Sequence, residues 1–224
     1  MPRNARCVQP DLPFHITQRG TDCRTTFHSR QDRRVYLDLV RTNFRECGVR
    51  ILCYCLMTNH VHLVAMPAHS DSLAVLFRRV HGRYAQYLNA RRQRTGHLWQ
   101  NRFFSCALSR SHLWTALRYV ELNPVRACLV ATPGEYEWSS AAAHLSGEYD
   151  SGILDPEFWC GHGGAERWRE LLEEREDPDQ TRLLRRCTFA GRPFGDEEFL
   201  TSMEEQFQRK WRRWAYEAYS ASGR

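Results

Sequence analysis

Apolar residues recur along the chain with two different periods, and the change of period predicts the order of its elements. Alternating or short continuous apolar runs are typical of strands. They occur at residues 14–16, 49–56, 60–66 and 103–108. Apolar residues spaced three or four apart predict helices. They occur at residues 31–47, 71–92 and 111–120. The predicted order is therefore strand, helix, strand, strand, helix, strand, helix.

The short connection between the second and third predicted strands indicates how they pair. Only Met57, Thr58 and Asn59 separate these strands, and so short a link implies an antiparallel hairpin. The order of elements then predicts an α+β fold. We expect an antiparallel sheet with helices packed on one side of it, close to the split βαβ plan.

A composition change predicts where the main domain ends. Residues 146–152 are rich in glycine and polar side chains, so we divide the chain into a domain at 1–150 and a helical tail at 151–224. One tail helix is expected around Trp168. The second would carry four apolar residues spaced four apart, Phe199, Met203, Phe207 and Trp211. Such a stripe usually docks on a neighbouring domain, although it could instead cover the site.

Charge separates the same two parts of the chain. Residues 1–150 hold 20 arginines and 11 acidic residues, a net charge of +9, whereas residues 151–224 have a net charge of −3. A basic domain suits a phosphate polymer, because binding releases the counterions of that polymer. Lys210 is the only lysine, and arginine binds phosphate bidentately. An ordinary solvated surface is the alternative interpretation.

Cysteine usage and hydropathy bear on the compartment. The nine cysteines include no Cys-x-x-Cys pair, and we expect reduced thiols, with Cys53 and Cys55 as small core residues. No apolar run approaches the roughly 20 residues that a membrane helix needs, and the start of the chain has no apolar signal segment. These features favour a cytoplasmic protein without membrane contact.

A histidine pair is the main chemical signal. His60 and His62 lie in one predicted strand, where residues two apart point to the same face. Both imidazoles would then lie side by side, with Val61 and Leu63 on the other face. Imidazole binds divalent metals, so the pair predicts two ligands of a metal site. The alternative is that both are sheet histidines with satisfied hydrogen bonds.

Several stretches of the sequence together resemble one family of enzymes. They lie at residues 13–20, 57–64, 94–103, 119–127 and 138–140, with a further match in the tail at 190–195. Met57-Thr58-Asn59-His60-Val61-His62-Leu63-Val64 resembles the histidine-hydrophobic-histidine (HUH) motif of single-tyrosine transposases of bacterial insertion sequences. The set is most similar to the REP-associated tyrosine transposases, because Tyr-x-x-x-Asn-Pro-Val-Arg-Ala follows His-x-His in the family's order.

The resemblance implies a ferredoxin-like HUH nuclease fold and a covalent mechanism. Tyr119 would attack a phosphodiester and hold DNA as a 5′-phosphotyrosine. Because the pKa of free tyrosine is about 10, the family uses a divalent cation, Mg²⁺ or Mn²⁺, which would be held here by His60, His62 and Asn123. Asn123 lies one helical turn after Tyr119. The alternatives are a core aromatic at Tyr119 and a helix C-cap at Asn123, where Pro124 disfavours α geometry.

The expected partner is single-stranded DNA, and the resemblance adds an adjacent DNA hairpin, which the tail at 151–224 could also contact. Aromatic and polar side chains alternate from residue 97 to residue 103, which suits stacking on unpaired bases. The candidate DNA contacts are Arg19, Arg78, Arg79, Arg83, His97, Trp99, Gln100, Arg102, Arg126 and Arg192. Trp99 could instead belong to the core, and the arginines on the long helix could form a solvated face.

The most specific interpretation is a transposase, a metal-dependent enzyme that nicks and joins single-stranded DNA. A catalytically silent DNA-binding or regulatory protein on the same fold is one alternative. A metal hydrolase of the amidohydrolase type also uses His-x-His, but that fold is a barrel of about 250 residues. This chain is shorter, and its predicted order lacks eight strand–helix units.

Overall fold

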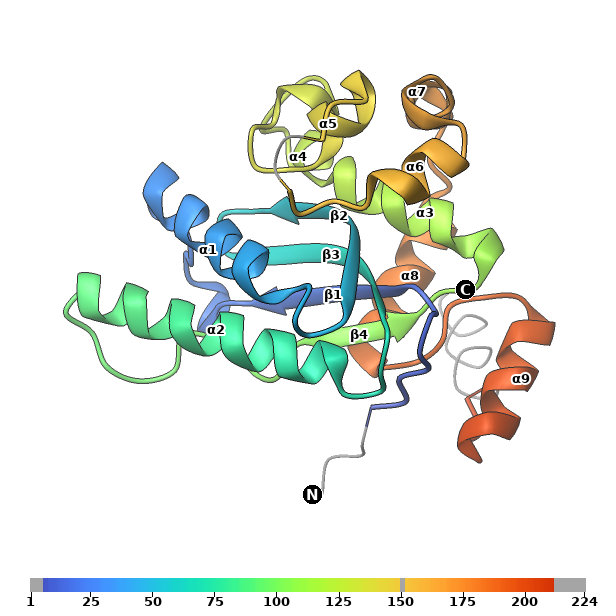
Figure 1. The fold of residues 1–224 in the computed structure, drawn as a ribbon, viewed down its shortest axis with the longest axis horizontal. Helices are drawn as coiled ribbons and strands as arrows, with labels where there is room; N and C mark the ends of the chain where they lie inside the picture. Colours follow the sequence, from blue (N-terminus) through green and yellow to red (C-terminus); the bar gives the residue numbers. More distant parts are fainter. Residues whose placement is uncertain (1–5, 150–151, 212–224) are drawn as a thin grey trace, which may run out of the picture.

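The computed structural model describes residues 6–149 and 152–211. Within these residues the centre is a sheet of four antiparallel strands in the order β2-β3-β1-β4 (Figure 1). The strands are β1 (Phe14–Arg19), β2 (Val49–Leu56), β3 (His60–Pro67) and β4 (Phe104–Ala107). The predicted hairpin between β2 and β3 is confirmed, and the Met57 N–H closes it by donating to the His60 carbonyl over 2.9 Å.

Helices cover both faces of the sheet. On one face lie α1 (Arg30–Asn43) and α2 (Ser72–Arg91), and on the other lie α3 (Arg110–Glu121) and α8 (Pro178–Ala190). Figure 1 shows α1 and α2 in front of the sheet and α8 behind it. The prediction that helices lie on one side is therefore wrong. The physical reason is that β2 is buried on both faces from Ile51 to Leu56, so each face needs a cover.

Capping residues define the ends of the helices more precisely than apolar spacing does. Ser29 and Asp32 form a capping box that starts α1, and the helix ends at Asn43 instead of residue 47. The chain then turns through Gly48, whose φ of 61° is in the left-handed region. Ser109 caps α3 by accepting a hydrogen bond from the His112 N–H.

The sequence around Pro124 forms a second, one-turn helix. α3 ends at Glu121, and α4 (Asn123–Arg126) begins after the single turn residue Leu122. Asn123 is thus helical, although Pro124 was expected to disfavour α geometry there. Proline is tolerated in a first helical turn because the N–H that it lacks would have no helical acceptor there.

The tail is more helical than its apolar spacing predicts. It contains α6 (Pro156–Gly161), α7 (Gly164–Glu173), α8 and α9 (Glu197–Phe207). The helices of the described chain that precede the tail also include the 3-10 helices η1 (Thr21–Cys23) and η2 (Pro133–Glu135), and α5 (Ala141–Ser146). α7 contains Trp168 as predicted. α9 holds only three of the four predicted stripe residues, because Gln208 adopts φ 49° and ends the helix. Trp211 lies beyond it and is still buried.

Residues from both parts of the chain share two cores, one on each face of the sheet. Trp159 of α6 donates from its indole N–H to the Leu52 carbonyl of β2 over 2.9 Å. Phe194 extends the β4 edge through a parallel bridge to Leu108. Cys53 and Cys55 are fully buried, as predicted. The tail therefore contributes to the same packed unit as the sheet.

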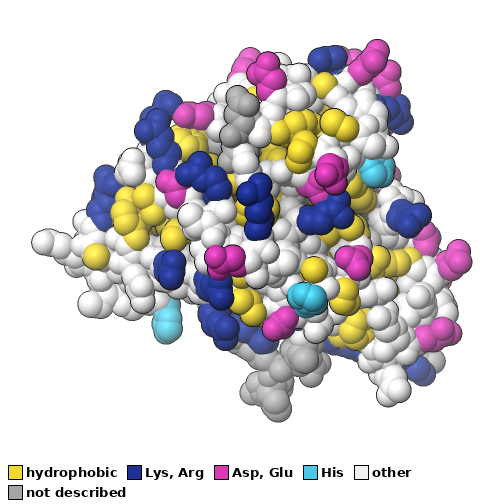
Figure 2. Space-filling model, in the orientation of Figure 1, with side chains coloured by type: hydrophobic (Ala, Val, Ile, Leu, Met, Phe, Trp, Pro, Cys, Tyr) yellow, Lys and Arg dark blue, Asp and Glu magenta, His cyan; other side chains and the backbone are white. Residues whose placement is uncertain are grey.

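The surface in front of the sheet carries mixed charge. Figure 2 shows basic side chains interspersed with acidic ones over α1, and both kinds side by side over the upper part that holds α5 and α7. Among the described helices, none combines the length and apolar character needed to cross a membrane.

Candidate active site

The two histidines of β3 project to the face that α3 and α8 cover. The His60 and His62 ring centroids lie 4.9 Å apart, with an interplanar angle of 85°. Val61 and Leu63 pack into the core on the opposite face. Strand alternation thus places two imidazoles next to each other, as the sequence predicts.

A chain of hydrogen bonds determines which nitrogen of His62 carries the proton. The Thr188 hydroxyl donates to the Leu184 carbonyl over 2.8 Å, so its oxygen accepts from His15 Nδ1–H at 2.7 Å. His15 Nε2 is then an acceptor, and His62 Nδ1–H donates to it over 3.0 Å. His62 therefore keeps the lone pair on its Nε2, which is the state that a metal ligand requires.

His60 reaches the same state by a different contact. Its Nδ1 lies 2.6 Å from Asn59 Oδ1, and an amide oxygen only accepts, so His60 also carries its proton on Nδ1. Burial lowers the pKa of His60 to about 4, with Arg19 and Arg185 lowering it further. Burial lowers the pKa of His62 well below its usual value. Both rings are neutral at pH 7 and are able to bind a cation.

Tyr119 of α3 lies edge-on to the histidines. Its ring centroid is 5.4 Å from that of His62 and 5.5 Å from that of His15, with both pairs near perpendicular. Burial raises the pKa of the phenol, while Arg126, Arg185, Asn123 and Arg19 each lower it in part. The phenol thus sits in a buried site whose surrounding arginines favour its anion.

Asn123, the third predicted ligand, lies next to the Tyr119 backbone. Its Nδ2 donates to the Tyr119 carbonyl over 3.0 Å, which orients the amide and leaves Oδ1 as an acceptor. Within residues 6–149 and 152–211, no three His, Cys, Asp or Glu side chains converge on a metal position. The Asn123 oxygen is the remaining candidate for a third protein ligand, as the family resemblance implies. Two neutral imidazoles and an amide oxygen fit Mn²⁺, and leave positions for water on a hard cation.

This site lies within a recognisable family sequence. A family model described as "Transposase IS200 like" matches residues 9–123, which include both β3 histidines and Tyr119.

The chain belongs to the IS200-like transposase family.

Comparison of structures agrees on the fold of this transposase. A solved structure titled "Structure of the REP associates tyrosine transposase bound to a REP hairpin" superposes with a TM-score of 0.57. The two chains are 15% identical, and the match covers 69% of this chain and 92% of the other. No curated protein sequence matches the chain significantly. The family assignment makes the protein an enzyme of DNA transposition, which acts on DNA.

The transposase brings two of its predicted DNA contacts, Arg19 and Arg126, to the candidate catalytic residues. Arg19 pairs in register with His60 at the end of β1. The next position, Gly20, requires glycine, because a Cβ there would lie 2.5 Å from the Arg24 carbonyl oxygen. Arg126 lies over the Tyr119 ring with its guanidinium carbon 4.4 Å from the centroid. It also pairs with Glu176 at 2.7 Å and donates to the Tyr119 carbonyl.

The loop after α2 lies beside the same end of the sheet. The Gln100 N–H donates to the Arg19 carbonyl over 3.0 Å, and His97 is exposed on the same loop. Trp99 is only partly exposed, and its indole N–H donates to the His81 carbonyl over 3.0 Å. Trp99 therefore packs against the core, which was the alternative interpretation, and does not present a free stacking surface.

The other predicted contacts lie elsewhere on the transposase. Arg102 and Arg192 line one groove of about 320 Å³ along the outer edge of β4. The exposed arginines of α2 cover the layer on the opposite side of the sheet from His60, and they are Arg78, Arg79 and Arg83. The structure therefore separates these three arginines from His60, His62 and Tyr119.

Sequence reasoning missed His15 and Thr188, and it placed Arg185 only among the arginine clusters of the tail. His15 was visible only as one histidine in a strand, although its alternation with Ile16 places it on the His62 face. Thr188 and Arg185 come from α8, which was not predicted, and nothing in their local sequence connects them with residue 62. Only the packing of α8 on β1, β4 and α3 brings them there.

Proposed function

We propose that this transposase nicks single-stranded DNA through a 5′-phosphotyrosine at Tyr119 and transfers the strand. The observation that carries the proposal is the placement of Tyr119 edge-on to His62 and His15, within the field of Arg19 and Arg126. A nucleophile, two neutral metal-binding imidazoles and fixed positive charge meet in one buried site. These are the parts that phosphodiester transfer needs.

The proposed reaction needs no external energy source. The Tyr119 oxygen attacks the scissile phosphorus, the bond from phosphorus to the 3′ oxygen breaks, and the phenolic proton passes overall to that 3′ oxygen. The products are a 5′-phosphotyrosine and a free 3′-OH. Attack of another 3′-OH on the phosphotyrosine rejoins the strand and restores the phenol, so the bond energy is conserved.

The residues of the site also determine what assists this step. A divalent cation, Mg²⁺ or Mn²⁺, held by His60, His62 and Asn123 would neutralise the phosphate oxygens and stabilise the leaving 3′ oxygen. Arg19 supplies positive charge at the same end of the sheet. Burial excludes competing water from Tyr119, which is 6% exposed.

The surroundings of the site support a single-stranded DNA substrate. The exposed polar loop at residues 97–103 lies beside Arg19, and it could contact unpaired DNA. The similar transposase was solved with a REP hairpin, which supports a hairpin next to the cleaved strand here. We assign catalysis to residues 1–150 and additional DNA contact to the tail at 151–224.

The experiment compares cleavage of one oligonucleotide in two forms. A hairpin with a single-stranded flank, taken from the sequence bordering the protein's own gene, should be cleaved with Mn²⁺ and not with EDTA. The fully paired form should resist cleavage, and Tyr119→Phe should retain DNA binding without cutting. Binding without cleavage by the wild type would instead support the catalytically silent alternative. The hydrolase alternative requires a barrel and does not fit a four-stranded sheet.

A further inference from the structure

One face of α8 is exposed and carries positive charge beside the catalytic residues. Leu184, Cys187 and Thr188 point inward and are buried. The outward residues recur at helical spacing and line a groove of about 600 Å³, and they include Arg182, Arg185, Arg186 and Phe189. Because Thr188 contacts His15, this groove begins within one helical turn of the hydrogen-bond chain that ends at His62.

Arg185 differs from the other arginines near Tyr119. Arg126 is held by Glu176 at 2.7 Å, whereas Arg185 makes no hydrogen bond or ion pair with any residue of the described chain and is exposed. Its charge nevertheless acts on both His60 and Tyr119. An exposed guanidinium that has no partner in the described chain, in a groove beside a nucleophile and a metal-binding residue, is free to bind an anion there.

Phe189 stands one turn further along the same face. It is 45% exposed, although its ring is held against Phe104 of β4 at 5.1 Å in a T-shaped pair. It borders both the groove of α8 and the neighbouring groove that contains Arg102. A large aromatic ring that is half exposed, fixed in position and surrounded by arginines suits stacking on an unpaired base.

We propose that α8 is a nucleotide-binding platform, on which Arg185 binds a backbone phosphate next to the scissile bond and Phe189 stacks on a nearby unpaired base of single-stranded DNA. The two residues are four apart, or about 6 Å along the helix. A stacked strand advances about 3.4 Å per nucleotide. The stacked base is then one or two nucleotides from the phosphate bound by Arg185. This proposal rests on the proposed function, which places the scissile bond at Tyr119.

The surrounding charge favours a nucleic acid over a protein partner. A hydrophobic protein partner would bury Phe189, but it would also have to desolvate the arginines on either side of it. A single strand uses both features, because its phosphates pair with guanidinium groups and its bases provide π-faces.

The test measures binding of a fluorescein-labelled (dT)20 strand by anisotropy over a range of salt concentrations. Arg185→Ala should reduce the slope of log affinity against log salt by about 0.7, the value for one phosphate contact on a single strand. Phe189→Ala should weaken binding roughly fivefold or more and leave that slope unchanged, since stacking is not ionic. Phe189→Trp should restore affinity.

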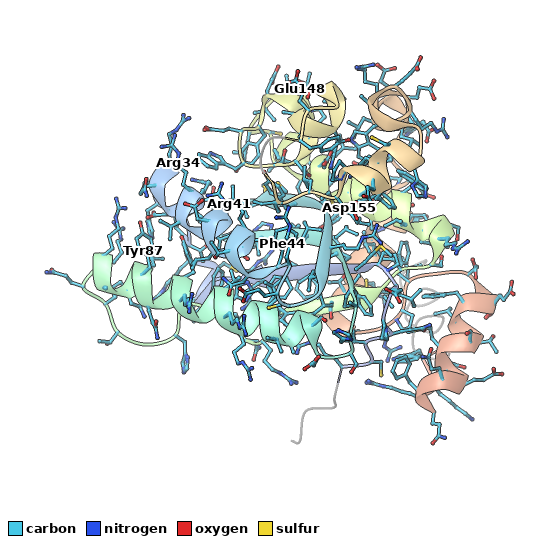
Figure 3. All side chains as sticks on the ribbon, viewed as in Figure 1. Arg34, Arg41, Phe44, Tyr87, Glu148 and Asp155 are labelled. Atoms are coloured by element: carbon cyan, nitrogen blue, oxygen red, sulfur yellow. The ribbon has the colours of Figure 1, made fainter. Side chains whose placement is uncertain are left out.

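Two matched variants serve as controls. Arg34→Ala removes one exposed arginine from α1, in the layer opposite α8 (Figure 3). Leu129→Ala removes another large exposed apolar side chain, 50% exposed. Both should bind (dT)20 like the wild type.

The outcomes separate this proposal from the proposed function. If the Arg185→Ala slope equals that of wild type, or if Phe189→Ala binds no more weakly than Leu129→Ala, the platform is wrong. Failure of the wild type to bind (dT)20, or a change in oligomeric state of Phe189→Ala, also overturns it. A wild type that shows these binding effects but never cleaves contradicts only the covalent mechanism.

Discussion

Replacing Thr188 with valine tests whether the tail controls the metal-binding state of His62. Valine keeps the shape of threonine but removes the oxygen that accepts from His15 Nδ1–H at 2.7 Å. His15 then loses the contact that fixes its proton on Nδ1. If the proton moves to Nε2, His15 donates to His62 Nδ1, and His62 must carry its own proton on the nitrogen that should bind metal.

The expected losses of stability and metal affinity follow from the burial of this chain of hydrogen bonds. Thr188 is 1% exposed, so the valine variant leaves buried polar groups unpaired and should lose about 1–3 kcal/mol of stability. Loss of a hydrogen-bond partner of a ligating histidine typically weakens metal binding about 10- to 100-fold. We expect a reduction in that range for Mn²⁺ binding to the folded variant, measured by calorimetric titration.

Thr201→Val is the matched control. The Thr201 hydroxyl also donates to the carbonyl four residues earlier, at 2.7 Å, but on the exposed side of α9. It should bind Mn²⁺ like the wild type. Equal affinities for Thr188→Val, Thr201→Val and the wild type would refute the tautomer argument, even if the Thr188 variant is less stable.

Three further predictions concern separate features of the molecule. Asn123→Ala should weaken Mn²⁺ binding less than His60→Ala, because water can replace one oxygen ligand; equal losses in titration would exclude this role. Glu121 is fully buried and accepts from Ser140, His144 and the Trp168 indole, so Glu121→Ala should cost about 3 kcal/mol or more in urea unfolding. A loss below about 1 kcal/mol would contradict this. Burial lowers the pKa of His81 from 6.5 to about 3, so its contribution to stability is complete above pH 6.5 and is lost as pH falls toward 3. His81→Gln should therefore reduce the pH slope of stability in that window by about 1.4 kcal/mol per pH unit, and an unchanged slope would argue against it.

The sequence predicts the parts of this site that depend on local periodicity. His60 and His62 share a face because strands repeat every two residues, and Asn123 contacts the Tyr119 backbone because helices repeat about every four. These relations hold whatever packs around them. The family resemblance added the expected chemistry, and the family model confirms the membership.

Features that depend on packing were not predictable in the same way. Trp211 continues the four-residue spacing of Met203 and Phe207 only in sequence, since the chain leaves the helix at Gln208 and buries the indole from a loop. The contact of His15 with Thr188 joins residues 173 positions apart. No local pattern encodes such a contact, because it requires α8 to cross β1 and β4.

The central claim, a covalent intermediate on Tyr119, is tested most directly by mapping the DNA-linked peptide. The wild type is incubated with Mn²⁺ and a hairpin oligonucleotide bearing a single-stranded flank, digested with protease, and analysed by tandem mass spectrometry. We predict a nucleotide 5′-phosphate on the peptide that contains Tyr119, and none in Tyr119→Phe. Attachment to a different residue, or strand cleavage without any linked peptide, would contradict the account.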